Sequence, residues 1–408
     1  MNATSARPSR RWLWTLVVAG VLVQSALQLL RPITTYKLVA FGAGGLTTGL
    51  VTAAYAVVPL VIALWLGRLT DRTTWLRQLI MLAAALMALG GVVLALAPSV
   101  LVLTLGSVVL GVAHLLFTIS GQAVIARSAR DEDLDLGFGW FTASYSVGQA
   151  LGPLVGGAIV GVGAVTASPE RLADVDRALW VGAAISLVAV PLLLWNPQRA
   201  AARTPSQRPV PVSPGVARQA TIPQVLRAPG VASNMLASMG LLAMVDILAA
   251  FMPLVGEAAG VSPTVVGVLL AIRGAAGIVS RALLPWLSRR WSRRRLLIAS
   301  LLVASVTLAV PPLVLDHLLV AGALLAIGGF FLGIGQPLTM TLIATAVPTH
   351  WRSQALAVRL MGNRVGQVGF PLLAGLAVAP FGPGGAIWMT SIVLAVVSAE
   401  KALRTTRR

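Results

Sequence analysis

Charged side chains are rare in the long apolar stretches of this chain, and the few that occur there could do chemistry. Asp246 is the only acid well inside such a stretch, and Arg31 and His114 lie in others. A charge within a bilayer is costly, so such a residue marks a proton or substrate site unless a partner holds it as a static pair. The further candidates for this site are Arg273, Asn363, Arg364, Gln24 and Gln149.

Several candidates also have a plainer explanation. A lone histidine in a packed helix, such as His114, is more often structural. Glutamines in apolar helices often form hydrogen bonds between helices. Arg364 and Asn363 could meet an anionic or polar substrate, and the sequence leaves both kinds of explanation open.

The composition argues against several other functions. The chain has no cysteine, which excludes disulfides and thiolate metal sites. The apolar stretches offer one acid and one histidine, so we expect neither an enzyme nor a bound metal or cofactor. No glycine-rich nucleotide loop supports ATP-driven work. In a soluble protein, a net charge of +19 would indicate nucleic-acid binding, but the distribution of the charge along this chain does not support that function.

The elements that position these residues are long apolar helices. The chain has 408 residues, of which 57% are hydrophobic and 11% charged, and its mean hydropathy is +0.88. Runs of near twenty apolar residues recur, and each can cross a bilayer core of about 30 Å as a helix. We predict an all-α membrane protein with twelve transmembrane helices, at about 13–37, 46–66, 78–98, 101–126, 138–160, 178–195, 231–254, 263–286, 296–313, 318–344, 354–377 and 384–402.

Charge sets the orientation of these helices. The segments on one side of the predicted membrane contain 24 arginines and lysines, and those on the other side contain four. This asymmetry places both termini in the cytoplasm, and tryptophans at the predicted helix ends agree with it. The basic N-terminus resembles a signal peptide, but the apolar run from Trp12 to Leu30 is too long for one, so we expect an uncleaved first helix.

A long basic segment divides the chain into two halves that repeat each other. Residues 196–230 contain five arginines, seven prolines and no acid, which predicts a poorly ordered cytoplasmic linker between domains 1–195 and 231–408. Adding 218 to the residue number carries the triplet from Val147 to Gln149 onto the identical triplet from Val365 to Gln367. The same offset carries Pro153 onto Pro371. Two parallel repeats of six helices follow.

The segment from Gly67 to Arg77 is the first specific motif. Gly67 would permit a close backbone approach, and Asp71 and Arg72 place a charge pair at the membrane boundary. The pattern resembles the loop between helices 2 and 3 of the major facilitator superfamily. The resemblance covers essentially the whole chain and implies two pseudosymmetric six-helix bundles. It also implies that Asp71 faces the start of helix 11 and acts there as a gate. The alternative is that Asp71 and Arg72 form only a solvated charge pair in a loop.

The second motif lies in the fifth predicted helix. Gly148, Gly152, Pro153, Gly156 and Gly157 place small residues four apart, which lets helices pack closely, and the proline bends the helix. The pattern resembles a signature of proton-coupled exporters in the superfamily. A tight helix interface without any encoded direction is the alternative. Ser107 stands where many such exporters carry an arginine.

Charges on two further loops predict a latch. In the second copy of the gate motif, Arg289 stands where the repeat would place the acid Asp71, and Arg290 matches Arg72. Asp131 and Asp133 precede the fifth helix, which this loop should face by pseudosymmetry. We expect these opposite charges to close the cytoplasmic side, and ordinary positive-inside charge is the alternative.

The resemblance also brings Arg31 and Asp246 together. Helices 1 and 7 line the central cavity in this family, and the repeat maps Arg31 one turn from Asp246. Protonation of Asp246 would then release the pair and act as a proton-driven gate. The alternative is a static buried pair.

These expectations combine into one function. We expect an alternating-access transporter in the inner (plasma) membrane of a bacterium, active as a monomer, that exports a small drug-like molecule or metabolite in exchange for protons. The second hypothesis is uptake of an organic anion or sugar, favoured by the buried arginines. The expected partners are therefore a small-molecule substrate, protons and the lipid bilayer, without nucleic acid.

Overall fold

The computed structural model describes residues 11–129, 134–163, 169–195, 221–348 and 351–406. In these ranges the chain is helical and contains no strand. The first half contains α1 (Arg11–Ala40), α2 (Gly45–Arg72), α3 (Leu76–Ala95), α4 (Val100–Ser128), α5 (Leu134–Val160) and α6 (Pro169–Trp195). The second half contains α7 (Ile222–Arg227), α8 (Val231–Ala258), α9 (Pro263–Arg290), α10 (Arg293–Ala309), η3 (Pro311–Leu313), α11 (Leu318–Thr345), α12 (Arg352–Phe381) and α13 (Gly385–Thr406).

The long helices make this a multi-pass membrane protein. Eleven of those in the described ranges are long and apolar enough to cross a bilayer. The remaining long helix, α5, has 27 residues and is therefore also long enough, but its serines, glycines and glutamine make it less apolar. The predicted twelve-helix fold is confirmed.

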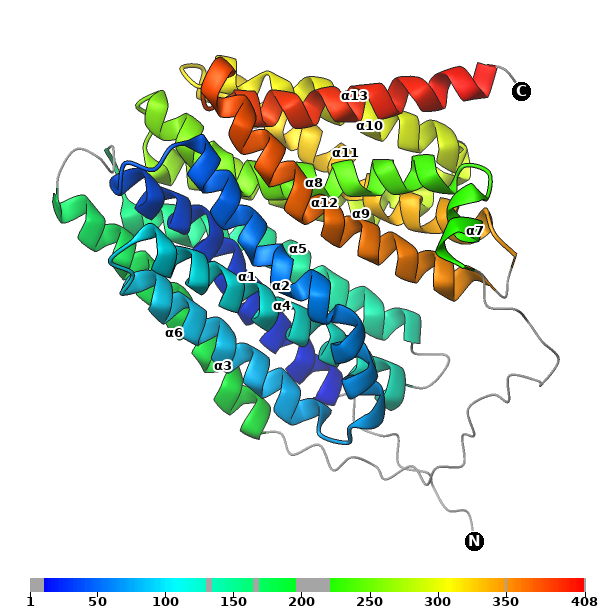
Figure 1. The fold of residues 1–408 in the computed structure, drawn as a ribbon, viewed down its shortest axis with the longest axis horizontal. Coiled ribbons are helices and arrows are strands. Elements are labelled where there is room, and N and C mark those ends of the chain that lie inside the picture. The colour runs from blue at the N-terminus through cyan, green and yellow to red at the C-terminus, as the bar shows by residue number, and fades with distance from the viewer. Residues whose placement is uncertain (1–10, 130–133, 164–168, 196–220, 349–350, 407–408) are drawn as a thin grey trace, which may run out of the picture.

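The helices form two bundles that lie side by side, one coloured blue to green and the other green to red in Figure 1. Leucines, valines and alanines of α1 to α6 form one buried core, and those of α8 to α13 form another. Helices α1, α2 and α5 of the first bundle contact α8, α9 and α12 of the second. We call the end of the molecule at which α6 ends and α8 begins the linker end, and the opposite end the far end.

Two equivalent glycine crossings join the bundles at the far end. Where α2 crosses α12, a Cβ added at Gly49 would lie 3.1 Å from the Cα of Gly375. Where α5 crosses α9, a Cβ added at Gly267 would lie 3.1 Å from the Cα of Gly157. The offset of 218 relates Gly49 to Gly267 and Gly157 to Gly375. The repeat therefore builds the same backbone contact twice, once on each side of the interface.

The other glycines of the second motif pack α5 against α1, as expected for a tight helix interface. A Cβ added at Gly148 would lie 2.5 Å from the Cβ of Gln24, and one at Gly152 would lie 2.7 Å from the Cβ of Gln28. Gly156 lies against Leu29 in the same way, at 3.1 Å. Pro153 lies inside α5. The expected packing role of these glycines is thus confirmed.

Three predicted boundaries were wrong in an informative way. Helix α2 continues through the gate motif to Arg72, so the motif forms the last turns of a helix and not a loop. Helix α6 begins at Pro169, nine residues early, because Asp174 pairs with Arg171 and Arg177 one turn away on either side. The predicted linker contains the short helix α7, whose Val225 is buried beside α8.

Candidate functional site

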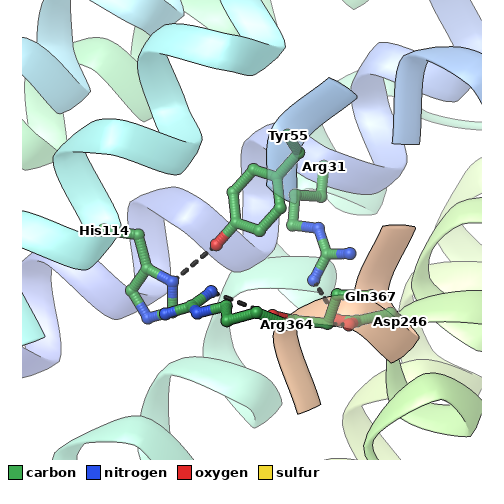
Figure 2. Close-up of polar contacts among 6 residues, drawn as sticks. All are labelled: Arg31, Tyr55, His114, Asp246, Arg364 and Gln367. Carbon is green, nitrogen blue, oxygen red and sulfur yellow. Dashed lines mark hydrogen bonds and ion pairs between the residues drawn. The ribbon is translucent and has the colours of Figure 1, made fainter. Parts of the chain in front are cut away.

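A chain of polar contacts crosses the centre of the interface between the bundles (Figure 2). Arg31 of α1 donates to Asp246 of α8, with Nη1 2.6 Å from Oδ1. Gln367 of α12 donates to the other carboxylate oxygen at 2.8 Å. Arg364, one turn earlier on α12, donates to Oε1 of Gln367 at 2.9 Å. The pairing of Arg31 with Asp246, which the sequence left open, is present in the structure, and both oxygens of the carboxylate are occupied.

The first bundle adds a group of neutral hydrogen-bonding side chains beside this chain. The guanidinium of Arg31 lies over the ring of Tyr55, 4.8 Å from its centroid. The Tyr55 hydroxyl lies 2.5 Å from Nδ1 of His114, as Figure 2 shows, while Nε2 of His114 is buried without a partner. Tyr145 and Thr118 share a hydrogen bond of 2.7 Å. These residues come from α2, α4 and α5, so three helices supply neutral donors and acceptors.

The remaining predicted site residues lie around this centre. Gln24 is buried and contacts Tyr145. Asn363, next to Arg364 on α12, is buried and its Oδ1 has no partner. Gln149 of α5 is partly buried, and its backbone carbonyl group lies against α9: a Cβ added at Gly274 would lie 2.5 Å from the carbonyl oxygen.

Three more arginines in the second bundle differ in what they contact. Arg273 of α9 is 4% exposed, and it has neither a hydrogen bond nor an ion pair with any described residue. Arg281, two turns further along α9, donates to Ser146 of α5 and so bridges the bundles. Arg359 of α12 donates to the side chain of Gln336 at 2.6 Å. Arg359 is thus held within its bundle, whereas Arg273 is not.

The structure places the predicted gate residues less centrally. Gly67 was expected to permit a close backbone approach, and this is wrong here, since a Cβ added to it would meet no atom within 4 Å. Arg77 donates to the carbonyl groups of Leu193 and Leu194, so it caps the end of α6 within its own bundle. The side chains of Asp71 and Arg72 lie outside the described part of the structure.

The predicted latch is described on one side only. Asp131 and Asp133 lie outside the described residues. Arg289 and Arg290 are exposed at the end of α9, and the guanidinium of Arg290 lies over the ring of Trp286 at 4.5 Å. The latch therefore stays a prediction.

Sequence reasoning missed Tyr55, Tyr145 and the contact between Ser146 and Arg281. Tyrosine is rare in this chain, with three residues, and two of them lie in this cluster. That rarity was an available signal. Arg281 lies within the helix predicted at 263–286, and no signal in the sequence pointed to its contact with Ser146.

Comparison with known proteins identifies the family. The sequence profile of the Major Facilitator Superfamily matches residues 16–246 and 235–406, which together span nearly the whole chain. The chain belongs to the major facilitator superfamily. This transporter matches no curated protein sequence.

Solved structures agree on the fold of this transporter. A bacterial homologue of the human lysosomal transporter Spinster, in an inward-facing and occupied conformation, superposes with a TM-score of 0.71 at 16% identity, covering 98% of each chain. The nucleoside transporter NupG gives 0.74 at 14% identity, with 96% of this chain and 98% of that chain covered. A D-xylose-proton symporter gives 0.74 at 16%, with 96% and 97% covered. At such identities the likeness concerns the fold alone.

In the described ranges no group of histidine, cysteine, aspartate and glutamate side chains could hold a metal ion. The centre of this transporter instead contains one carboxylate, several guanidinium groups and neutral hydrogen-bonding groups. These are groups that can bind a polar molecule.

Proposed function

We propose that this protein is a proton-coupled secondary transporter in which Asp246 carries the proton. The observation that supports this is the ion pair of Arg31 with Asp246, which joins the two bundles at 2.6 Å. Each partner belongs to a different half of the chain, so breaking the pair removes a connection between the halves. A buried pair of this kind loses most of its attraction when one partner becomes neutral.

The fold supplies the rest of an alternating-access cycle. The linker end collects most of the positive charge and therefore faces the cytoplasm. The two glycine crossings then close the outer side in this conformation. Protonation of Asp246 leaves Arg31 without its counter-charge, and the bundles are freed to rotate about the centre. Residues 1–195 and 231–408 act as the two moving units in this scheme.

Export in exchange for protons remains our expectation for the direction, and it rests on the resemblance of residues 148–157 to exporters. Those glycines pack helices, which a transporter of either direction needs. The geometry therefore supports coupling more directly than it supports direction.

The test compares Asp246→Asn with the wild type in proteoliposomes. Proton movement would be recorded while lipophilic cations, sugars and organic anions are added in turn. The control is Asp316→Asn, because Asp316 is 72% exposed and pairs only with His317. We expect substrate-dependent proton movement in the wild type and in the control, and none in Asp246→Asn. Unchanged proton movement in Asp246→Asn would remove Asp246 from the mechanism.

A further inference from the structure

Arg273 is a buried cation that forms no ion pair with any described residue. Its side chain is 4% exposed, its Nε has no partner, and the charges of Arg281, Asp246 and Arg31 act on it. A guanidinium group does not lose its proton in proteins, so Arg273 cannot become neutral to escape the cost of burial. An uncompensated charge at this depth costs several kcal/mol in general, which a structural residue would not be expected to impose.

The repeat shows which way Arg273 faces. The offset of 218 makes Arg273 the equivalent of Tyr55, and Gly329 the equivalent of Gly111. Each glycine lies directly against its partner: a Cβ at Gly111 would meet the backbone of Tyr55, and one at Gly329 would lie 2.9 Å from Cγ of Arg273. Tyr55 points to the centre, where it meets Arg31 and His114. Arg273 therefore occupies the matching central position in the second bundle.

No acid in the described part of the chain is free to neutralise this charge. Asp246 is the acid of the centre, and Arg31 and Gln367 already occupy its two oxygens. Arg364 has only the neutral Gln367 as a partner among the described residues. Arg281 and Arg359 at least bond Ser146 and Gln336, whereas at the centre the guanidinium groups of Arg273 and Arg364 remain without a carboxylate. A planar guanidinium matches the two oxygens of a carboxylate or phosphate.

We propose that the transported molecule is a small organic anion whose carboxylate or phosphate group binds Arg273, and that protonation of Asp246 strengthens this binding. The proposal rests on the proposed function above, and it names the substrate class of the same site. A proton on Asp246 removes the one negative charge near Arg273, so an incoming anion meets more uncompensated positive charge. Proton and anion are then bound together and move in the same direction, so this proposal favours the second hypothesis, uptake of an organic anion with protons, over export in exchange for protons.

The other charged groups near Asp246 do not reverse the effect of its protonation on anion binding. Those acting at the centre are positive or neutral, namely Arg31 of α1, Tyr55 of α2, Arg273 of α9 and Arg364 of α12. On α13, Glu400 and Lys401 bond Ser233 and Asn234, about 18 Å from Asp246 along α8. Asp246 is therefore the group whose proton alters the charge met by the anion.

The binding test uses four probes that share a phenyl ring: benzoate, phenyl phosphate, benzyl alcohol and benzylamine. Thermal unfolding of the purified protein would be followed with each probe at about 10 mM, ten times the upper end of typical KM values. We expect benzoate or phenyl phosphate to raise Tm and the neutral and cationic probes to have no effect. Which anion acts distinguishes a carboxylate from a phosphate site. Equal effects of all four probes, or no effect of either anion, would overturn the proposal.

Two methionine variants separate binding from structure. Arg273→Met should weaken anion binding by at least about 30-fold, the factor that corresponds to 2 kcal/mol. Without any anion it should raise Tm, because it removes an unpaired buried charge. Arg359→Met is the matched control and should lower Tm, because it removes the 2.6 Å hydrogen bond to Oε1 of Gln336 and leaves that oxygen only a longer one, 3.4 Å, from Ser238. A fall in Tm for Arg273→Met with anion binding intact would show that Arg273 is structural.

A third variant tests the link to the proton and keeps the two proposals apart. Asp246→Asn imitates the protonated acid, so at neutral pH it should bind the anion about tenfold more tightly, within the usual range of coupling. Weaker binding in Asp246→Asn would overturn the link. If the wild type moves protons with sugars or cations but binds no anion, the substrate class fails while proton-coupled transport stands. If anions bind but no proton moves, proton-coupled transport fails while the substrate class stands.

Discussion

Substitution of Gly375 by alanine should open the far end of the molecule. A Cβ at this position would lie 2.8 Å from the carbonyl oxygen of Gly45 and 3.0 Å from the Cα of Leu46. Both atoms belong to the backbone of α2, which cannot rotate away as a side chain can. The two helices must therefore separate at the crossing that closes the far end.

The expected magnitude follows from the clash. Forcing a methyl group into a packed contact typically costs about 1–3 kcal/mol. The cost applies only while α2 and α12 are in contact, so it changes the balance between conformations. A shift of 1–3 kcal/mol changes their ratio by a factor of about 5 to 150. Gly157→Ala at the equivalent crossing should add a similar shift, because the two sites share no contact.

The control is Gly369→Ala, six residues earlier on α12. A Cβ at Gly369 would meet no atom within 4 Å, so this change raises helix propensity without a clash. Any difference between the two variants then reports the crossing and not the loss of a glycine.

The absence of cysteine makes the assay simple. Thr35→Cys introduces one thiol on α1, at a residue that is 2% exposed and bonds the carbonyl of Ala250 across the bundles. A membrane-impermeant thiol reagent added on the far side should label this cysteine about 5 to 150 times faster in the Gly375→Ala background. Equal labelling in the Gly375→Ala and Gly369→Ala backgrounds would refute the reasoning.

Three further changes have defined outcomes. Lys37→Met should lower the free energy of unfolding by about 3 kcal/mol, because the buried Lys37 ammonium donates to two carbonyl groups of α3 and pairs with Asp176. The control is Arg177→Met, which should change the free energy of unfolding by less than about 1 kcal/mol, because the Arg177 side chain is 68% exposed. Thermal unfolding measures both. Arg77→Gln should lower Tm without altering far-end labelling, since Arg77 caps α6, and a change in labelling would restore it as a gate. Replacement of all three acids at positions 131–133 by lysine should raise the labelling of a cysteine introduced at the linker end, and unchanged labelling would exclude the latch.

The helices could be predicted from the sequence because bilayer thickness fixes their length and apolar composition. The ends of the helices could not be placed as well, because charged residues were taken to lie in loops. Asp174 and Arg177 look like an external segment, yet their pairing one turn apart extends α6. Arg281 lies well inside α9, and its contact with Ser146 across the bundles could not be read from its charge.

The central pair could be predicted because the repeat and the family placed Arg31 near Asp246. The roles of the surrounding groups could not. No sequence signal says that Arg359 has a partner and Arg273 has none, since that depends on Gln336 of α11 lying within reach of one and not the other. The charged members of the candidate site are therefore predictable from the sequence, whereas its two tyrosines and most of its contacts are not.

The two halves preserve their mechanics and differ in their charge. The glycine crossings match each other position by position, so each half contributes equally to closing the far end. At the centre the equivalents diverge: Gln28 matches Asp246, Tyr55 matches Arg273, and Ser146 matches Arg364. Each of these positions is neutral in the first half and charged in the second. Packing that must open and close symmetrically tolerates little change, whereas a site that binds one molecule needs no symmetry. In our proposal the second bundle therefore supplies the proton site and the anion site, and the first supplies Arg31 and hydrogen bonds around them.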